Sequence, residues 1–540
     1  MEEFTEDEKE ILKHFFTNMD KPIFALVNLP EVVKGALFSR YSRSTKSLRR
    51  VLLDEFIKSP EMGFKEIVGF QKGQDVDQFV AIQKAEEFYD RILVGFGDDS
   101  IAELGGASIA VEDVSNICSK VLEDARIGLS PLEKSTRYVF FNDKVDGKFR
   151  YYRDPEIMNS GFAELFLQTC DMLFETYGKL SEPMMKWVME KFPMEEGVSD
   201  RAYSTSVRSK SLDVLRVLLP AATLTNVGIF GNGRAFEYLI TKMYSHQLKE
   251  MRDVAWQMQT ELAKVIPSFV KRANDKHGVE SQKFIYDTRE GTRKITEDIL
   301  SGMVKSPVEH VELVKWDPEA EAKVVAAIMY QHSQLPMRQL IDIASKMSEE
   351  DRKKILAEFL SRRSNRRNKP GRAFENVHYT FDILGNYGIF RDLHRHRMLT
   401  QERQDLTVKH GYDTPKEIIQ AGFQGEYDEA MKAAADAFEQ IFSALPKQAQ
   451  YIVPMGFRIR WYFTMNLREV YYLTELRTMA QGHSDYRKVA QLIFQKVKQV
   501  HPNLMEFAKF VDMNDYSLGR LSSEMKIDRK IEELRKKYRS

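Results

Sequence analysis

Apolar residues recur every three or four positions along most of the chain, which is the spacing typical of amphipathic helices. Residues 162–192 place Phe162, Phe166 and Cys170 on a broad apolar stripe, and residues 426–445 repeat this pattern near the end of the chain. Both segments predict long helices that bury one face against a hydrophobic core.

Shorter segments have the β-branched and aromatic composition that favours strands, namely residues 137–141, 310–316 and 377–384. Long helices and short strands therefore occur in both halves of the chain, and we predict an α+β architecture. No run of 18 apolar residues is present, so the sequence predicts no membrane-spanning helix.

The two halves carry similar patterns in the same order. Pro220 lies 12 positions before Asn232, and Pro454 lies 12 positions before Asn466. Each of these asparagines begins an Asn-x-Arg triplet. Several matches in one order predict an internal duplication.

Further upstream, Glu103 in the first half corresponds to Glu375 in the second, and a polar segment separates the two repeats. We therefore predict a first domain over residues 1–275, a linker over 276–304 and a second domain over 305–540. Each domain is expected to be a mixed sheet packed with long helices.

Composition narrows the class of protein. The chain has 540 residues, with Lys+Arg 80 against Asp+Glu 80, and this balance argues against a general binder of polyanions. Its two cysteines, Cys118 and Cys170, cannot form a disulfide framework and suit a reducing compartment as buried thiols. Since the acidic N-terminal segment is unlike a targeting peptide, we predict a cytoplasmic protein.

A dense group of donors follows an apolar stretch of the second half: His394, Arg395, His396 and Arg397. The planar fork of arginine suits phosphate or carboxylate. A helix C-terminus decorated with cations is the alternative interpretation. Metal binding is not expected, because no His-x-x-Glu motif is present here and the arginines would repel a metal ion.

The corresponding place in the first half lacks the basic group but holds Ser130, Glu133, Ser135, Arg137 and Tyr138. Hydroxyls that alternate with Glu and Arg can form a turn that presents donors to an anionic ligand. An ordinary polar loop is the alternative.

Together these segments resemble the signature Arg-His-Arg-x-x-Ser-x-Asn-x-x-Ser-x-Arg of the flavin-dependent thymidylate synthases. Residues 395–400, "RHRMLT", are similar to its first part, and residues 130–138, "SPLEKSTRY", are similar to its second part. The resemblance covers most of both halves, so the chain looks like a tandem of two family domains.

The departures from the signature are complementary. In the second half the later signature positions hold Glu402, Asp405 and Thr407, and Gln450 stands where the family has arginine. The first half reads Ala-Arg-Ile at residues 125–127, in place of Arg-His-Arg.

Each half nevertheless keeps what the other has lost. The first half retains Ser135, Arg137 and Arg216, whereas the second retains Arg395 and Arg477. We therefore predict one composite site between unlike halves.

The resemblance implies a role for each retained residue. Arg395 and Arg477 would be catalytic, the substrate would be bound by one set, and the flavin would be held by another. The substrate set is Glu133, Ser135, Arg137, Arg216, Arg395 and Arg477, and the flavin set is His396, Arg397, Thr400, Asn466 and Arg468.

The implied reaction is the methylation of dUMP to dTMP, with FAD as cofactor and with NADPH and methylenetetrahydrofolate as co-substrates. Family members assemble as tetramers, so a tandem chain is expected to form a homodimer. The alternatives are a related flavoenzyme acting on another pyrimidine and a non-catalytic scaffold that binds flavin or nucleotide. The basic residues 361–372 lack interleaved aromatic residues, which argues against nucleic-acid binding and favours a solvated turn or a loop over an anionic cofactor.

Overall fold

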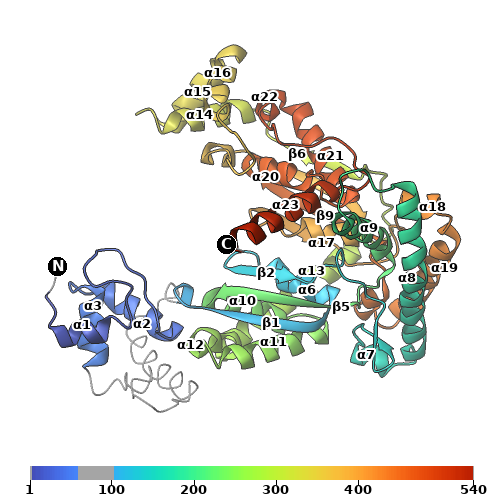
Figure 1. Cartoon of the computed structure of the whole chain (residues 1–540), viewed down its shortest axis with the longest axis horizontal. Coiled ribbons are helices and arrows are strands. Elements are labelled where there is room, and N and C mark those ends of the chain that lie inside the picture. The colour runs from blue at the N-terminus through green and yellow to red at the C-terminus, as the bar shows by residue number, and fades with distance from the viewer. Residues whose placement is uncertain (1–2, 59–101, 539–540) are drawn as a thin grey trace. The chain divides into compact units, whose positions relative to one another are not determined.

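The computed structural model of the chain describes residues 3–58 and 102–538 (Figure 1). These residues form two compact units. The first unit contains residues 3–58, 102–114, 118–134 and 225–303. The second unit contains residues 115–117, 135–224 and 304–538. The middle of the first half therefore packs with the second half of the chain.

The first unit combines helices with one small sheet. Its helical elements are α1 (Glu6–Leu12), α2 (Glu31–Tyr41), α3 (Leu48–Val51), the π-helical η1 (Leu52–Ile57), α6 (Asn116–Asp124), α10 (Gly233–Tyr244), α11 (Lys249–Leu262), α12 (Pro267–Val270), η5 (Lys271–Asn274) and α13 (Lys276–Leu300). Its strands are β1 (Gly106–Ser115), β2 (Leu129–Glu133) and β5 (Leu224–Asn232), in the order β1-β5-β2.

The second unit contains a larger sheet, a short hairpin and the longest helix. Its helical elements are α7 (Pro155–Met158), α8 (Ala163–Lys191), α9 (Asp200–Leu215), η4 (Arg216–Leu218), α14 (Ala320–Tyr330), α15 (Met337–Lys346), α16 (Glu349–Leu360), η6 (Arg372–Glu375), α17 (Tyr387–Leu393), α18 (Lys416–Gln420), α19 (Gln424–Phe442), η7 (Gln448–Ile452), α20 (Leu467–Arg477), α21 (Ser484–Val500), α22 (Pro502–Met505) and α23 (Leu521–Tyr538). Its strands are β3 (Lys144–Val145), β4 (Lys148–Phe149), β6 (Val311–Lys315), β7 (His378–Asn386), β8 (Leu399–Arg403) and β9 (Arg458–Asn466).

The antiparallel sheet of the second unit has the order β6-β7-β9-β8, with α20 and α21 packed against it. Alternate residues of its two central strands are fully buried, including Phe381, Ile383, Trp461 and Phe463. This period of two is what a half-buried sheet requires. The long helix α8 packs against α9 and α19, as Figure 1 shows.

The two sheets confirm the tandem α+β fold. The order β1-β5-β2 matches β7-β9-β8, and β6 is an addition to the second sheet. The register matches as well, because Leu129 pairs with Gly231 in the first sheet and Leu399 pairs with Met465 in the second. Asn232 and Asn466 each end the central strand and cap the helix that follows.

Most of the predicted elements are present. Helices α8 and α19 confirm the two long apolar segments, and β6 and β7 confirm two of the three strands. The polar segment predicted as a linker is largely the helix α13. Cys118 and Cys170 are buried as expected, and burial raises the pKa of each thiol. No helix among residues 3–58 and 102–538 is long and apolar enough to cross a bilayer.

The predicted strand over residues 137–141 is wrong, because this segment is a turn followed by irregular chain. Ser135 starts the turn: its Oγ accepts a hydrogen bond from the Arg137 backbone N–H at 3.2 Å, and its carbonyl accepts one from Tyr138 at 3.4 Å. Local bonding of this kind competes with strand pairing.

Candidate functional site

Within the second unit, a short pair of segments forms one of the contacts between the two repeats. Pro220 and Pro454, which correspond in the repeats, face each other in an antiparallel bridge. Ala221 N donates to Val453 O and Met455 N donates to Leu219 O, both at 2.9 Å. Each of these bonds is the repeat counterpart of the other.

A second matched pair of hydrogen bonds extends this contact. Ala222 N donates to Tyr451 O, and Gly456 N donates to Val217 O, both at 2.8 Å. The backbones of the two repeats are therefore related by a local pseudo-twofold at the prolines. Each backbone position on one side of this axis has an equivalent position on the other side, and the side chains at the two positions can differ.

The side chains next to this axis do differ. Arg216 is buried, and its Nη2 donates to Asp392 Oδ2 at 3.0 Å and to the Gly388 carbonyl at 3.2 Å. At the matched position, Gln450 instead accepts a hydrogen bond from Leu406 N at 3.0 Å. Only the first-repeat position carries a cation into the contact with the other repeat.

Arg137 lies in the same region, where the turn at Ser135 positions its backbone. Its Nε and Nη2 form a two-pronged ion pair with Asp213 at 2.6 and 2.7 Å, and Nη2 also donates to the Gln481 carbonyl at 3.2 Å. Its Nη1 makes no hydrogen bond with any described residue, so this end of the guanidinium remains available to a ligand.

His483 links Asp213 to the second repeat. Its Nδ1 accepts from Asp485 N at 3.2 Å at the start of α21, and its Nε2 lies 3.2 Å from the Asp213 carbonyl. These partners fit a neutral ring that is protonated at Nε2. Burial lowers the pKa of His483, and the positive charge of Arg216 lowers it further.

The carboxylates of this group stay ionised despite burial. Burial alone would raise the pKa of Asp392, but Arg216, Arg137 and Arg395 together hold it well below its usual range. In the same way the charge and the hydrogen bonds of Arg137 lower the pKa of Asp213 against its burial. Residues of both repeats therefore form one coupled electrostatic cluster.

A cavity of about 620 Å³ opens beside this cluster. Arg137, Asp213 and His483 form part of its wall. Its volume lies within the range of small-molecule sites.

The C-terminal segment 515–520 closes another side of this cavity, a role that the sequence did not reveal. Arg520 packs over the Tyr138 ring at 4.3 Å, and its buried Nε has no hydrogen-bond partner within the described part of the chain. An orphaned buried donor beside a cavity suits an anionic ligand. Residues 512–520 form an irregular loop.

A second polar chain lies between the Arg-His-Arg segment and α20. His396 is buried, its Nδ1 lies 2.6 Å from Glu469 Oε1, and its Nε2 accepts from Arg477 Nε at 2.8 Å. The ring therefore fits a neutral tautomer protonated at Nδ1, which orients Arg477. The Tyr472 ring lies 5.4 Å from the ring of His396.

The rest of the basic segment follows the end of α17. Arg395 and Arg397 are exposed in the turn after Leu393, and Thr400 is exposed on β8 opposite Thr464 of β9. Helix α17 therefore ends at Leu393, before Arg395 and Arg397, so these two arginines do not belong to its last turn.

Three predicted site residues have structural partners. Asn466 caps α20 by accepting from Glu469 N at 2.8 Å, and Arg468 pairs with Glu375 at 2.8 Å. Glu133 belongs to the first unit, where it is buried against Lys120 at 2.9 Å.

The helix cap made by Asn466 and the ion pair made by Arg468 both have counterparts in the first repeat. Asn232 accepts from Ala235 N at 2.8 Å, and Arg234 pairs with Glu103 at 2.8 Å. Because both repeats keep these contacts, the Asn-x-Arg signal reflects the shared fold.

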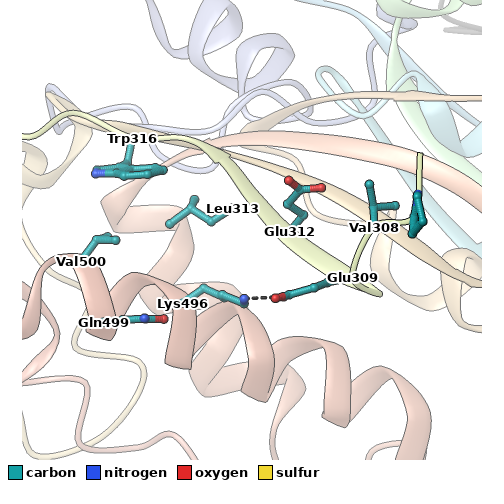
Figure 2. Close-up of a pocket in the computed structure, with 9 residues that line it drawn as sticks. Val308, Glu309, Glu312, Leu313, Trp316, Lys496, Gln499 and Val500 are labelled. Carbon is teal, nitrogen blue, oxygen red and sulfur yellow. Dashed lines mark hydrogen bonds and ion pairs between the residues drawn. The ribbon is translucent and has the colours of Figure 1, made fainter. Parts of the chain in front are cut away.

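A smaller hollow of about 350 Å³ lies between β6 and α21, as Figure 2 shows. Trp316, Leu313 and Val500 form its apolar part, and Glu309 forms an ion pair with Lys496 at its edge. It contains none of the predicted site residues, and its acidic groups oppose an anionic ligand. The cluster around Arg137 is therefore the stronger candidate.

Comparison with known families agrees with the repeat structure. The model of a family described as thymidylate synthase complementing protein matches residues 50–268 and 312–503. The match thus occurs once in each half of the chain.

Two of the similar proteins match this chain over more than nine tenths of its length. A UPF0159 protein of Chlamydia pneumoniae is 46% identical over 527 residues, which cover 97% of this chain and 98% of the relative. A UPF0159 protein of Thermoplasma acidophilum is 36% identical over 528 residues, covering 91% of this chain and 98% of the relative. A flavin-dependent thymidylate synthase of Sulfurisphaera tokodaii is 30% identical over 147 residues, 25% of this chain and 55% of the relative.

Proposed function

The chain belongs to the thymidylate synthase complementing protein family, and from this premise we propose that it methylates dUMP to dTMP at one composite site. The proposed reaction converts dUMP, methylenetetrahydrofolate, NADPH and one proton into dTMP, tetrahydrofolate and NADP⁺. The observation that supports it most is the cluster in which Arg137 and Arg216 of the first repeat meet Asp392 and His483 of the second beside a cavity.

In this proposal the arginines hold the nucleotide. The unpaired Nη1 of Arg137 is a donor for the phosphate, and Arg216 adds a fixed positive charge. Asp213 and Asp392 restrain the two guanidinium groups, which lowers the cost of ordering them when the nucleotide binds. Arg395 and Arg477 would stabilise the negative charge that develops on the pyrimidine ring.

The residues of the second repeat suit a flavin. Arg395 and Arg397 are exposed donors on the turn after α17, Thr400 is an exposed donor on the adjoining strand β8, and buried His396 orients Arg477. Donors of this type fit the diphosphate and the ring edge of FAD. When bound, FAD supplies the hydride relay that connects NADPH with the transferred carbon. Asn466 and Arg468 would support this site through the start of α20.

We also propose that the chain works in the cytoplasm as a homodimer. Two copies present four family domains, which is the number found in the tetrameric assemblies that the family resemblance implied. A particle mass from light scattering that corresponds to one chain would contradict this assembly.

The first experiment is the visible absorption spectrum of the purified protein, reconstituted with FAD and titrated with dUMP. A flavin band that shifts with dUMP in the wild type, and no longer shifts in Arg137→Ala or Arg395→Ala, is the expected result. Formation of dTMP from dUMP, methylenetetrahydrofolate and NADPH should accompany it. Bound flavin that ignores dUMP but responds to another pyrimidine nucleotide would overturn the substrate, and no bound flavin would overturn the catalytic proposal.

A further inference from the structure

The basic segment after α16 is an ordered loop organised by one buried arginine. Arg363 donates from Nη1 and Nη2 to the two carboxylate oxygens of Glu475 at 2.9 and 2.6 Å. It also donates to the carbonyls of Asn368 at 2.5 Å and Phe507 at 3.2 Å. The loop is therefore fastened to α20, the helix that carries Arg477.

Asn368 closes the loop from within. Its Oδ1 accepts hydrogen bonds from Ser364 N at 3.2 Å, Ser364 Oγ at 2.9 Å and Asn365 N at 3.2 Å. Three bonds to one oxygen fix the backbone of a short turn. The side chains that leave this turn start from a preorganised frame.

The turn presents three cations that lack a carboxylate partner at ion-pair distance within the described part of the chain. Arg366, Arg367 and Lys369 form no ion pair with any residue among 3–58 and 102–538, whereas their neighbours Arg362 and Arg372 do. Arg367 and Lys369 are exposed and Arg366 is half-buried. Three like charges within four residues repel one another, and an anion supplied from outside relieves this repulsion.

The loop also borders the proposed flavin side of the site. Lys369 Nζ lies 4.1 Å from the centroid of the Tyr472 ring, and that ring lies 5.4 Å from His396. Arg468 donates to the Pro370 carbonyl at 2.8 Å and so joins the loop to the start of α20. An anion held by the loop is thus one aromatic ring away from the Arg-His-Arg segment.

We propose that Arg366, Arg367 and Lys369 bind the 2′-phosphate of a phosphorylated nicotinamide dinucleotide and so select NADPH over NADH. This inference rests on the proposed function for the identity of the reductant. Arginine forks match the oxygens of a phosphate dianion, and arginine is the usual partner of a dinucleotide 2′-phosphate. Two adjacent arginines and a lysine concentrate charge on one such group, whereas the carboxylates of a polyglutamate tail are spread along a chain.

The test compares wild type, the triple variant Arg366→Gln/Arg367→Gln/Lys369→Gln and the control Arg362→Gln. Arg362 belongs to the same segment but is exposed and paired with Glu358 at 2.6 Å. Calorimetry with 2′,5′-ADP and 5′-AMP as probes measures the contribution of the 2′-phosphate without any flavin chemistry. We expect wild type and the control to bind 2′,5′-ADP about tenfold tighter than 5′-AMP, and the triple variant to lose this preference.

The second readout is the anaerobic rate of flavin reduction in protein loaded with FAD. We expect the triple variant to raise the NADPH concentration for half-maximal reduction about tenfold and to leave that for NADH unchanged. An unaltered ratio of NADPH to NADH would overturn the inference. So would a triple variant that keeps 2′,5′-ADP binding but loses affinity for a polyglutamylated folate or a single-stranded oligonucleotide. Failure to bind FAD would contradict the proposed function, and the calorimetric preference would then decide the loop site alone.

Discussion

Segments 216–222 and 450–456 are repeat counterparts whose backbones remain equivalent and whose side chains do not. Their four hydrogen bonds form two matched pairs around Pro220 and Pro454. Arg216 at one end pairs with Asp392, whereas Gln450 at the other end accepts from a backbone amide.

The conserved backbone pairing and the differing side chains of the two segments have different physical requirements. Backbone pairing is independent of side-chain identity, so both segments can retain it after duplication. A buried cation survives only where a partner compensates its charge. The asymmetry therefore supports one composite site, at the end where the arginine remains.

The largest expected effect comes from removing the charge at one end of this contact. Arg216→Gln leaves the carboxylate of Asp392 without its nearest cation, and the free energy of unfolding should fall by about 3–5 kcal/mol. The matched variant Gln450→Ala removes the hydrogen bonds with Leu406 N and with the Lys447 carbonyl, and it should cost about 1–2 kcal/mol. Urea unfolding of both variants measures the difference.

A double variant shows whether the charge is the cause. Adding Asp392→Asn to Arg216→Gln removes the uncompensated carboxylate, so part of the lost stability should return. Equal costs for Arg216→Gln and Gln450→Ala would show that the two ends are energetically alike.

Arg137 and Thr407 provide the next comparison, because they occupy corresponding signature positions in the two repeats. Arg137→Ala removes the donor assigned to the nucleotide and should weaken dUMP binding roughly tenfold or more. Thr407→Ala loses only a contact with Lys409 N at 3.3 Å and should leave binding unchanged. Calorimetric titration with dUMP measures both, and a comparable loss in Thr407→Ala would point to a site in each repeat.

The charge balance of the cluster predicts a smaller, pH-dependent effect. Because burial and Arg216 lower the pKa of His483, the unfolded chain binds a proton below about pH 6.5 that the folded chain excludes. Stability should therefore fall on acidification through this range, by at most about 1.4 kcal/mol per pH unit from this group.

His483→Gln should flatten this dependence. His410 and His501, whose pKa values burial also lowers, remain in both proteins, so the difference between the two profiles isolates His483. Unfolding midpoints in denaturant between about pH 5 and 8 provide the test. Parallel profiles would mean that His483 is not held neutral.

The smallest effects are expected from the ion pairs that both repeats retain. Arg234 and Glu103 are about half exposed, so Arg234→Ala should change stability by less than about 0.5 kcal/mol. Arg468 also donates to the Pro370 carbonyl, and Arg468→Ala should cost about 1 kcal/mol. Thermal unfolding distinguishes the two, and a larger cost at Arg234 would reverse their order.

Sequence periodicity predicted the elements whose pattern is long and regular. Helices α8 and α19 and strands β6 and β7 lie where the apolar spacing placed them. Residues 137–141 have a strand-like composition but form a turn, because the hydroxyl and carbonyl of Ser135 satisfy the local amides. Local hydrogen bonding of this kind is weakly encoded in composition.

The candidate site was predicted only in part. Arg137 and Arg216, which the sequence singled out, lie where the two repeats are in contact, whereas no sequence pattern singled out Asp213, Asp392 or Arg520. An isolated acidic residue or a tail arginine has no periodic or motif context, so only its neighbours in space reveal its role. The Asn-x-Arg pattern singled out Asn466, but this residue caps a helix just as Asn232 does in the first repeat, so its contact is part of the shared fold.

The sequence by itself determined the duplication, the α+β class and the unequal distribution of arginines, since repeats and composition are properties of chain order. The tertiary structure decided that residues 135–224 pack with the second repeat and that Arg216 meets Asp392, 176 positions away. Such pairings follow from the burial of surfaces distant along the chain, where a charge is stable only beside its counter-charge. The sequence shows which residues are charged, whereas the tertiary structure shows which of these charged residues are neighbours.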